Sequence, residues 1–163
     1  MRATNGPELP RGWRRLLFRI PILLFRAGLG GLFAGRMVLV EHAGRHTGKR
    51  RMVVLEVVDH DRTSGAVTVA SGFGPRADWY RNLRAQPHTV IRLRRRRIPV
   101  TATPLSAEQA AGVMVAYATA HPRSARGVAR LMGFAVDGSD ADYAAVGRAV
   151  PFLELVPDER AVQ

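Results

Sequence analysis

The feature that most constrains the fold is a series of short β-branched runs separated by glycine-containing turns. Residues 37–43 and 51–58 are rich in valine and leucine, and a segment with a glycine at each end, residues 44–48, separates them. This pattern predicts a β-hairpin. Similar runs predict four more strands, at residues 66–71, 89–93, 98–102 and 152–156. Six short, mostly antiparallel strands favour a small barrel, because closure leaves few sheet edges exposed.

Helical segments interrupt the strands. Residues 75–85 are predicted to form a short helix, and Ser106 starts a capping pattern before an alanine-rich helix that ends near His121. Pro122 can occupy the first turn of another helix, and residues 139–150 predict one more. The predicted fold class is therefore α+β, with about six strands flanked by helices.

The most apolar part of the chain, residues 11–36, is also basic. Arg19, Arg26 and Arg36 interrupt it, and its longest uncharged stretch has nine residues, four of them glycine. A membrane-spanning helix needs about 20 apolar residues, so we predict neither a span nor a secretory signal. The spacing instead predicts an amphipathic surface helix that Pro21 breaks or restarts. Its apolar face would cover the domain or a second subunit, or lie on an anionic membrane.

The charge is uneven along the chain. The 25 basic and 13 acidic residues give a net charge of +12, and the excess lies in the first 97 residues. This distribution indicates an anionic partner, such as a phosphorylated cofactor, nucleic acid or an acidic membrane surface. The chain has no cysteine, which excludes disulfides, thiolate metal sites and cysteine nucleophiles and is compatible with a reducing compartment.

The predicted turn of the first hairpin is the strongest local motif. Residues 44–51 read Gly-Arg-His-Thr-Gly-Lys-Arg-Arg, which combines two glycines with four basic side chains. Glycine lets a ligand approach the backbone closely, and guanidinium and backbone N–H groups bind phosphate or carboxylate. The spacing does not match a Walker A loop. The segment predicts either an anion-binding loop or a solvated basic turn.

A second glycine-containing loop precedes an aromatic pair. Gly72 and Gly74 would let the backbone run close to a flat group. Trp79 and Tyr80 offer stacking faces, and Asn82 offers amide hydrogen bonds. The alternative is that Trp79 anchors the core of the domain.

Other classes of site have little support. The five histidines show no metal-binding spacing, so we predict no metal site, and no serine-hydrolase motif is present. Arg92 and residues 94–97 would suit nucleic-acid phosphates, but few aromatic residues accompany them and no known nucleic-acid-binding pattern appears. We therefore expect a solvated strand edge there, and no nucleic-acid partner.

The order of these motifs resembles that of the deazaflavin-dependent nitroreductase family, within the split β-barrel oxidoreductases. The likeness extends over residues 37–157 and includes the Gly-Arg-His-Thr-Gly loop, Ala70-Ser71, the Trp-Tyr-x-Asn-Leu motif of residues 79–83, Pro87, the Pro122 helix and the strand after Pro151. It implies a split β-barrel coenzyme-binding domain at residues 37–163, preceded by the basic amphipathic segment 1–36. It also implies the coenzyme F(420), an 8-hydroxy-5-deazaflavin, with FMN as the alternative.

The resemblance also implies which residues hold the coenzyme. The family's loop grips the phosphate and acidic tail, and the matching positions include Arg45 and Thr47. His46 replaces the usual lysine, which would make its contact pH-dependent. Gly72 stands where the best-known branch has lysine, and the region after His121 lacks that branch's tyrosines. The implied cofactor-binding set is Arg45, His46, Thr47, Lys49, Arg51, Ser71, Trp79 and Asn82.

The resemblance implies hydride transfer from reduced F(420) to quinones, nitroaromatics or other electron-poor compounds. Deazaflavin performs this transfer itself, so the protein mainly binds and orients. Tyr117 and His121 are candidate proton donors. A non-catalytic carrier of a flavin, deazaflavin or lipid-like ligand is the alternative. We expect a cytoplasmic protein of an actinobacterial type, as a homodimer or peripherally bound to the inner face of the cell membrane.

Overall fold

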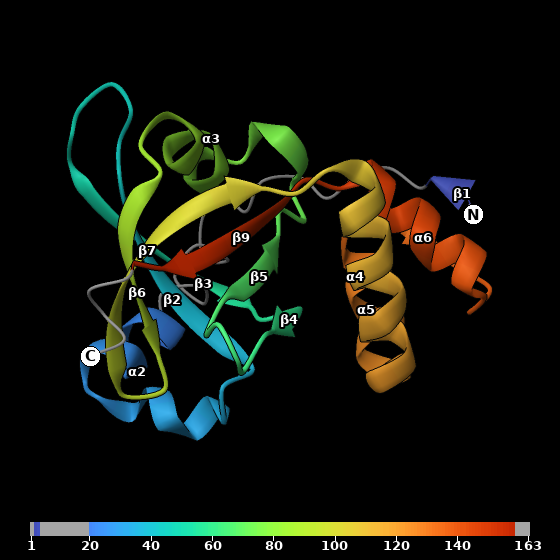
Figure 1. The fold of residues 1–163 in the computed structure, drawn as a ribbon, viewed down its shortest axis with the longest axis horizontal. Helices are drawn as coiled ribbons and strands as arrows, with labels where there is room; N and C mark the ends of the chain where they lie inside the picture. Colours follow the sequence, from blue (N-terminus) through green and yellow to red (C-terminus); the bar gives the residue numbers. More distant parts are fainter. Residues whose placement is uncertain (1, 4–19, 159–163) are drawn as a thin grey trace.

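The computed structural model describes residues 2–3 and 20–158, and its centre is a seven-stranded antiparallel sheet (Figure 1). Across the sheet the strands run β3 (Arg50–Glu56), β2 (Met37–Ala43), β6 (His88–Leu93), β7 (Arg96–Pro104), β9 (Phe152–Pro157), β5 (Val67–Ala70) and β4 (Asp59–His60). The two ends of the sheet approach each other, and the N–H of Val58 donates to the carbonyl of Thr68 at 2.9 Å. The sheet is therefore curled into a half-barrel, which confirms the predicted α+β class.

All six predicted strands are present. The two-residue β4 escaped sequence reasoning because two residues carry no periodicity. β7 begins at Arg96, two residues earlier than predicted, because its pairing with β6 sets Arg97 opposite Arg92. Both arginines lie within 3.7 Å of the buried carboxylate of Glu41, which Arg50 also contacts. β6 and β7 are inner strands, so the arginine run lies at the tip of a hairpin and not at the sheet edge that we expected, and part of it neutralises a buried acid.

The barrel interior is apolar. Alternate residues of the central strands face inward, as period-two patterning requires. Trp79 and Leu83 of α3 (Asp78–Ala85) join this core and cover one end of the barrel. The fully buried members of the core include Val38, Val40, Val67, Val69, Ile91, Val100, Leu153 and Leu155.

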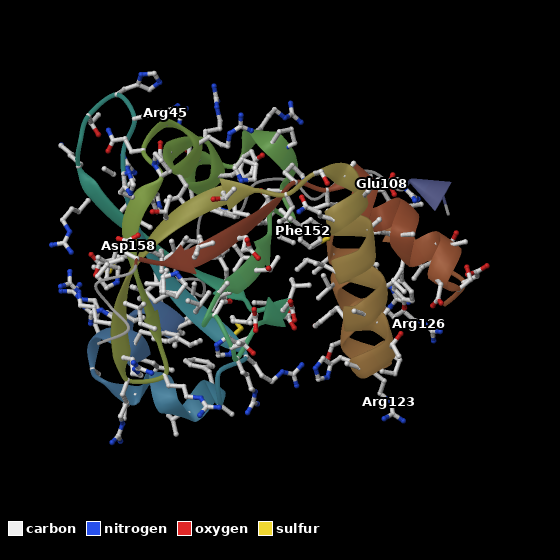
Figure 2. All side chains as sticks on the ribbon, viewed as in Figure 1. Arg45, Glu108, Arg123, Arg126, Phe152 and Asp158 are labelled. Atoms are coloured by element: carbon white, nitrogen blue, oxygen red, sulfur yellow. The ribbon has the colours of Figure 1, made fainter. Side chains whose placement is uncertain are left out.

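A helical layer forms a second core beside the barrel. It contains α4 (Ala107–Ala120), α5 (Pro122–Leu131) and α6 (Asp140–Ala149), and the short strand β8 (Phe134–Ala135) pairs with β1 (Arg2–Ala3). Ser106 and Gln109 form the predicted capping box of α4. Gly147 lets α6 approach α4 closely, since a β-carbon there would lie 2.5 Å from the carbonyl oxygen of Ala110. Phe152 belongs to this second core and lies where the barrel meets the helices (Figure 2).

The described part of the N-terminal segment packs beside the barrel. It forms α2 (Ile20–Arg26) and the 3-10 turn η1 (Leu29–Phe33). Phe25 is 2% exposed and stacks on Phe33 with ring centroids 5.2 Å apart. The first half of the predicted amphipathic helix lies outside the described residues. Within the described ranges, no helix is both long and apolar enough to cross a membrane.

Candidate functional site

The turn between β2 and β3 is a tight, hydrogen-bonded loop. The N–H of Gly44 donates to Lys49 at 2.9 Å, and the N–H of Gly48 donates to Gly44 at 2.7 Å. Gly48 has φ of 65°, a left-handed conformation that favours glycine. A β-carbon on Gly44 would lie 2.6 Å from Oγ1 of Thr47. Both glycines are thus needed for the loop to close on itself.

This loop and α3 enclose a small pocket of about 120 Å³. The pocket is of a size to take an anionic group rather than a ring system. Its lining brings together five residues of the predicted cofactor-binding set and adds one acid, Asp78. The five are Arg45, His46, Thr47, Arg51 and Asn82.

Arg45 is held from two sides. Its backbone N–H and its Nη1 both donate to Oδ1 of Asn82, at 3.1 and 3.0 Å. Nη1 also lies 3.1 Å from Oδ1 of Asp78, an exposed carboxylate in the first turn of α3. Figure 2 shows Arg45 at the end of the barrel where this loop lies. Asn82 is 2% exposed, so it fixes the loop from below rather than offering its amide to solvent.

His42 supports this arrangement from within the barrel. Its Nδ1 lies 3.0 Å from Nδ2 of Asn82. Burial, together with the nearby Arg51 guanidinium, lowers the pKa of His42 to about 4, although the Asp78 carboxylate opposes the shift. Sequence reasoning gave neither His42 nor Asp78 a role. The register of a hairpin that turns at residues 44–49 could have placed His42 opposite Arg51, where the structure has it.

Three residues of the predicted set lie outside the pocket lining. Lys49 is exposed and follows the loop. Ser71 is fully buried, donates its hydroxyl to the carbonyl of Gly74 at 2.7 Å, and so would meet a coenzyme only if that loop moved. Trp79 is 8% exposed and belongs to the barrel core. That placement fits the core-anchor alternative, and its contact with a coenzyme ring stays a prediction.

A second cavity, of about 390 Å³, lies between the other end of the hairpin and α4. Both candidate proton donors, Tyr117 and His121, line it, with their rings 5.5 Å apart. Arg36 and Arg94 also line this cavity. Its volume falls in the range typical of small-molecule sites.

The acid Glu56 organises one wall of the second cavity. Tyr117 donates its hydroxyl to Oε1 of Glu56 at 2.5 Å, and Nη2 of Arg36 lies 3.9 Å from the same oxygen. Arg36 also donates to the Ser124 hydroxyl at 3.0 Å. Burial and the Glu56 carboxylate raise the pKa of Tyr117 to about 12. Tyr117 therefore keeps its proton at neutral pH, and Glu56 is its acceptor.

The strand β3 connects the two cavities. Arg51 lines the small pocket, and Glu56, five residues further along the strand, contacts Tyr117, which lines the large cavity. At a rise of about 3.3 Å per residue, they lie about 17 Å apart. Successive side chains of a strand point to opposite faces, so Arg51 and Glu56 lie on opposite faces of β3.

Comparison with known families identifies the chain. Residues 24–138, well over half of its length, match the family model described as F(420)H(2)-dependent quinone reductase. The chain belongs to this family. The matched range includes the hairpin loop, Asn82, Tyr117 and His121.

Solved structures show the same fold for this F(420)H(2)-dependent quinone reductase family member. A structure named F(420)-H(2) dependent reductase (FDR-A) has a TM-score of 0.51 at 22% identity, covering 74% of this chain and 93% of that one. A conserved hypothetical protein from Mycobacterium tuberculosis has a TM-score of 0.54 at 11% identity, covering 98% and 87%. A third, described as a domain-swapped dimer, has a TM-score of 0.50 at 20% identity, covering 82% and 97%. No functionally curated protein matches the chain.

Proposed function

We propose that this protein is an oxidoreductase that uses reduced coenzyme F(420) to reduce quinones, nitroaromatics or other activated, electron-poor compounds. The observation that carries the proposal is the anion pocket of about 120 Å³ formed by the family's hairpin loop and α3. When bound, the reduced coenzyme supplies a hydride, which with one proton converts a quinone toward its hydroquinone and leaves the coenzyme oxidised.

The residues of the small pocket fit the phosphate and acidic tail of such a coenzyme. Arg45 and Arg51 supply guanidinium donors, and Thr47 supplies a hydroxyl. The absence of a β-carbon at Gly44 keeps Thr47 and the loop backbone close together. Asp78 is the one acidic side chain in the lining, and its pairing with Arg45 occupies that guanidinium until an anion replaces it.

The large cavity suits the electron acceptor, because both candidate proton donors line it. It lies about 17 Å from the anion pocket along β3, and its lining mixes apolar residues with Arg36, Tyr117 and His121. Tyr117 already donates its hydroxyl proton to the Glu56 carboxylate. His121 is exposed on the same wall, so a proton for the reduced product comes more readily through His121 or solvent than from Tyr117.

The decisive experiment mixes the purified protein with reduced F(420) and, separately, menadione and a nitroaromatic. We expect coenzyme binding by fluorescence and acceptor-dependent oxidation of the coenzyme by absorbance. Failure to bind the coenzyme would exclude the proposal. Tight binding without turnover over a quinone and nitroaromatic panel would instead support the carrier function.

The α2–η1 surface supports a second proposal, peripheral attachment to an anionic membrane. Ile20, Leu23, Leu29 and Leu32 are 43–73% exposed there. Arg26 ends α2 between these apolar residues, a composition typical of interfacial helices. We expect sedimentation with anionic but not neutral liposomes, weakened by salt. Equal binding to both kinds of liposome, or to neither, would contradict it.

The homodimer stays a separate proposal. The same exposed residues could lie at a subunit interface, which would hide them from lipid. Light scattering coupled to size-exclusion chromatography, at two protein concentrations, distinguishes a monomer of 17.9 kDa from a dimer of twice that mass.

A further inference from the structure

His42 lies beneath the anion pocket but is not one of the predicted coenzyme-binding residues. It is on β2, three residues before Arg45, and its side chain is buried at 8% exposure. Asn82, also buried, separates it from Arg45. A histidine at this position either fills space in the core or fixes the orientation of the Asn82 amide.

The hydrogen bonds decide how the Asn82 amide is oriented. Two N–H groups of Arg45 point at one atom of that amide, and both can only donate. The atom must therefore be the carbonyl oxygen. The amide nitrogen then faces His42, and it too can only donate. It follows that Nδ1 of His42 accepts, and that the ring proton lies on Nε2.

The surroundings of His42 maintain this acceptor. Its low pKa, caused by burial and by Arg51, keeps the ring neutral at physiological pH. A protonated ring would set two donors against each other at the 3.0 Å contact with Asn82. A buried donor without an acceptor is costly, so the amide orientation depends on this nitrogen.

We infer that His42 is a positioning residue of the coenzyme site: as its Nε2–H tautomer it fixes the Asn82 amide, and through it the Arg45 guanidinium and loop backbone that hold the anionic tail. This inference rests on the proposed function. It assigns His42 no contact with the coenzyme. Its effect should therefore appear in binding of the tail and not in the transfer step.

The first experiment compares two substitutions at this position. His42→Leu removes the acceptor and keeps the site apolar, whereas the side-chain oxygen of His42→Asn can take the place of Nδ1. We expect His42→Leu to raise the Kd and KM for F(420) about tenfold with kcat changed less than about twofold. His42→Asn should recover the Kd to within about threefold of wild type. An unchanged Kd in a folded His42→Leu variant, or equal losses in both variants, would overturn the inference.

A second measurement needs no activity. Imidazole nitrogen NMR on the free wild-type protein reports the tautomer directly. We expect the Nε2–H tautomer for His42 at neutral pH, and a change to Nδ1–H in Asn82→Asp, whose carboxylate can only accept. An Nδ1–H tautomer in the wild type would overturn the inference.

Inorganic pyrophosphate separates the failure of this inference from the failure of the proposed function. A wild-type protein that binds pyrophosphate but not F(420) would exclude the proposed function but not the inference about His42. The pyrophosphate affinities of the His42 variants would then test that inference. Binding of neither probe would overturn both. Binding of both, with the order wild type, His42→Asn, His42→Leu, is the expected result.

Discussion

Among single residues, Arg45 should contribute most to coenzyme affinity, because Asn82 and Asp78 hold its guanidinium at the pocket. A charge-assisted hydrogen bond contributes about 1.5–3 kcal/mol. Arg45→Ala should therefore raise the Kd for F(420) about tenfold to a hundredfold, measured by fluorescence titration. Arg123→Ala, an exposed arginine on α5 away from the loop, is the matched control (Figure 2). If the two variants bind equally well, the loop does not hold the coenzyme tail.

Asp78 should have the opposite effect on affinity. Its carboxylate pairs with Arg45 and repels an incoming anion, but it is 78% exposed, so the effect is small. Asp78→Asn should lower the Kd about two- to fivefold in low salt. Asp140→Asn removes a carboxylate from the first turn of α6, an equivalent position remote from the pocket, and should change nothing. Weaker binding in Asp78→Asn would show that Asp78 orders Arg45 rather than competes for it.

The buried His42 predicts a pH dependence of stability. Its pKa is about 4 in the folded protein against 6.5 ordinarily, so between these values the unfolded chain binds a proton that the folded chain does not. The stability that neutral His42 contributes is thus complete above pH 6.5 and is lost as the pH falls toward 4. Urea unfolding at both ends of this window should show a smaller loss in His42→Asn than in wild type. Parallel losses would show that His42 titrates normally.

At the scale of elements, the boundary after residue 36 that the sequence predicts can be tested by truncation. α2 contributes the buried Phe25, and Gly30 of η1 lies so close to Arg94 that a β-carbon there would come within 2.4 Å of its carbonyl oxygen. Deleting residues 1–19 removes β1 and its pairing with β8, and should lower the melting temperature less than the longer deletion does. Deleting residues 1–30 also removes Phe25 and should cost about 3–5 kcal/mol of unfolding free energy. Equal stability of the two truncations would support the boundary at residue 36.

At the scale of the whole molecule, coenzyme binding should stabilise the fold, because the two cavities are formed by segments far apart in sequence. A ligand at 100 times its Kd stabilises the native state by about 2.7 kcal/mol. For a chain of this size the melting temperature should rise by about 5–10 °C. The same concentration of FMN should give a smaller shift. An equal or larger shift with FMN would contradict the choice of F(420) as the cofactor.

The sequence by itself determined the local elements of this protein. The apolar, β-branched runs of β2 and β3, the glycines of their turn and the Ser106 capping box are short-range signals, and the structure confirms each of them. The order of motifs was sufficient to indicate the family. These predictions succeeded because they depend on residues that are close in the chain.

Only the tertiary structure decided which distant residues meet. Asn82 is 37 residues from Arg45 and 40 from His42, and no local pattern shows that its amide lies between them. Tyr117 and Glu56 are likewise 61 residues apart. Trp79 could have stacked on a ligand or filled the core, and the closure of the barrel around it left it in the core. The physical reason is that the burial of side chains and the direction of their hydrogen bonds are fixed only when the sheet curls. Burial and hydrogen-bond direction in turn set the tautomer that we infer for His42 and the position of Arg45.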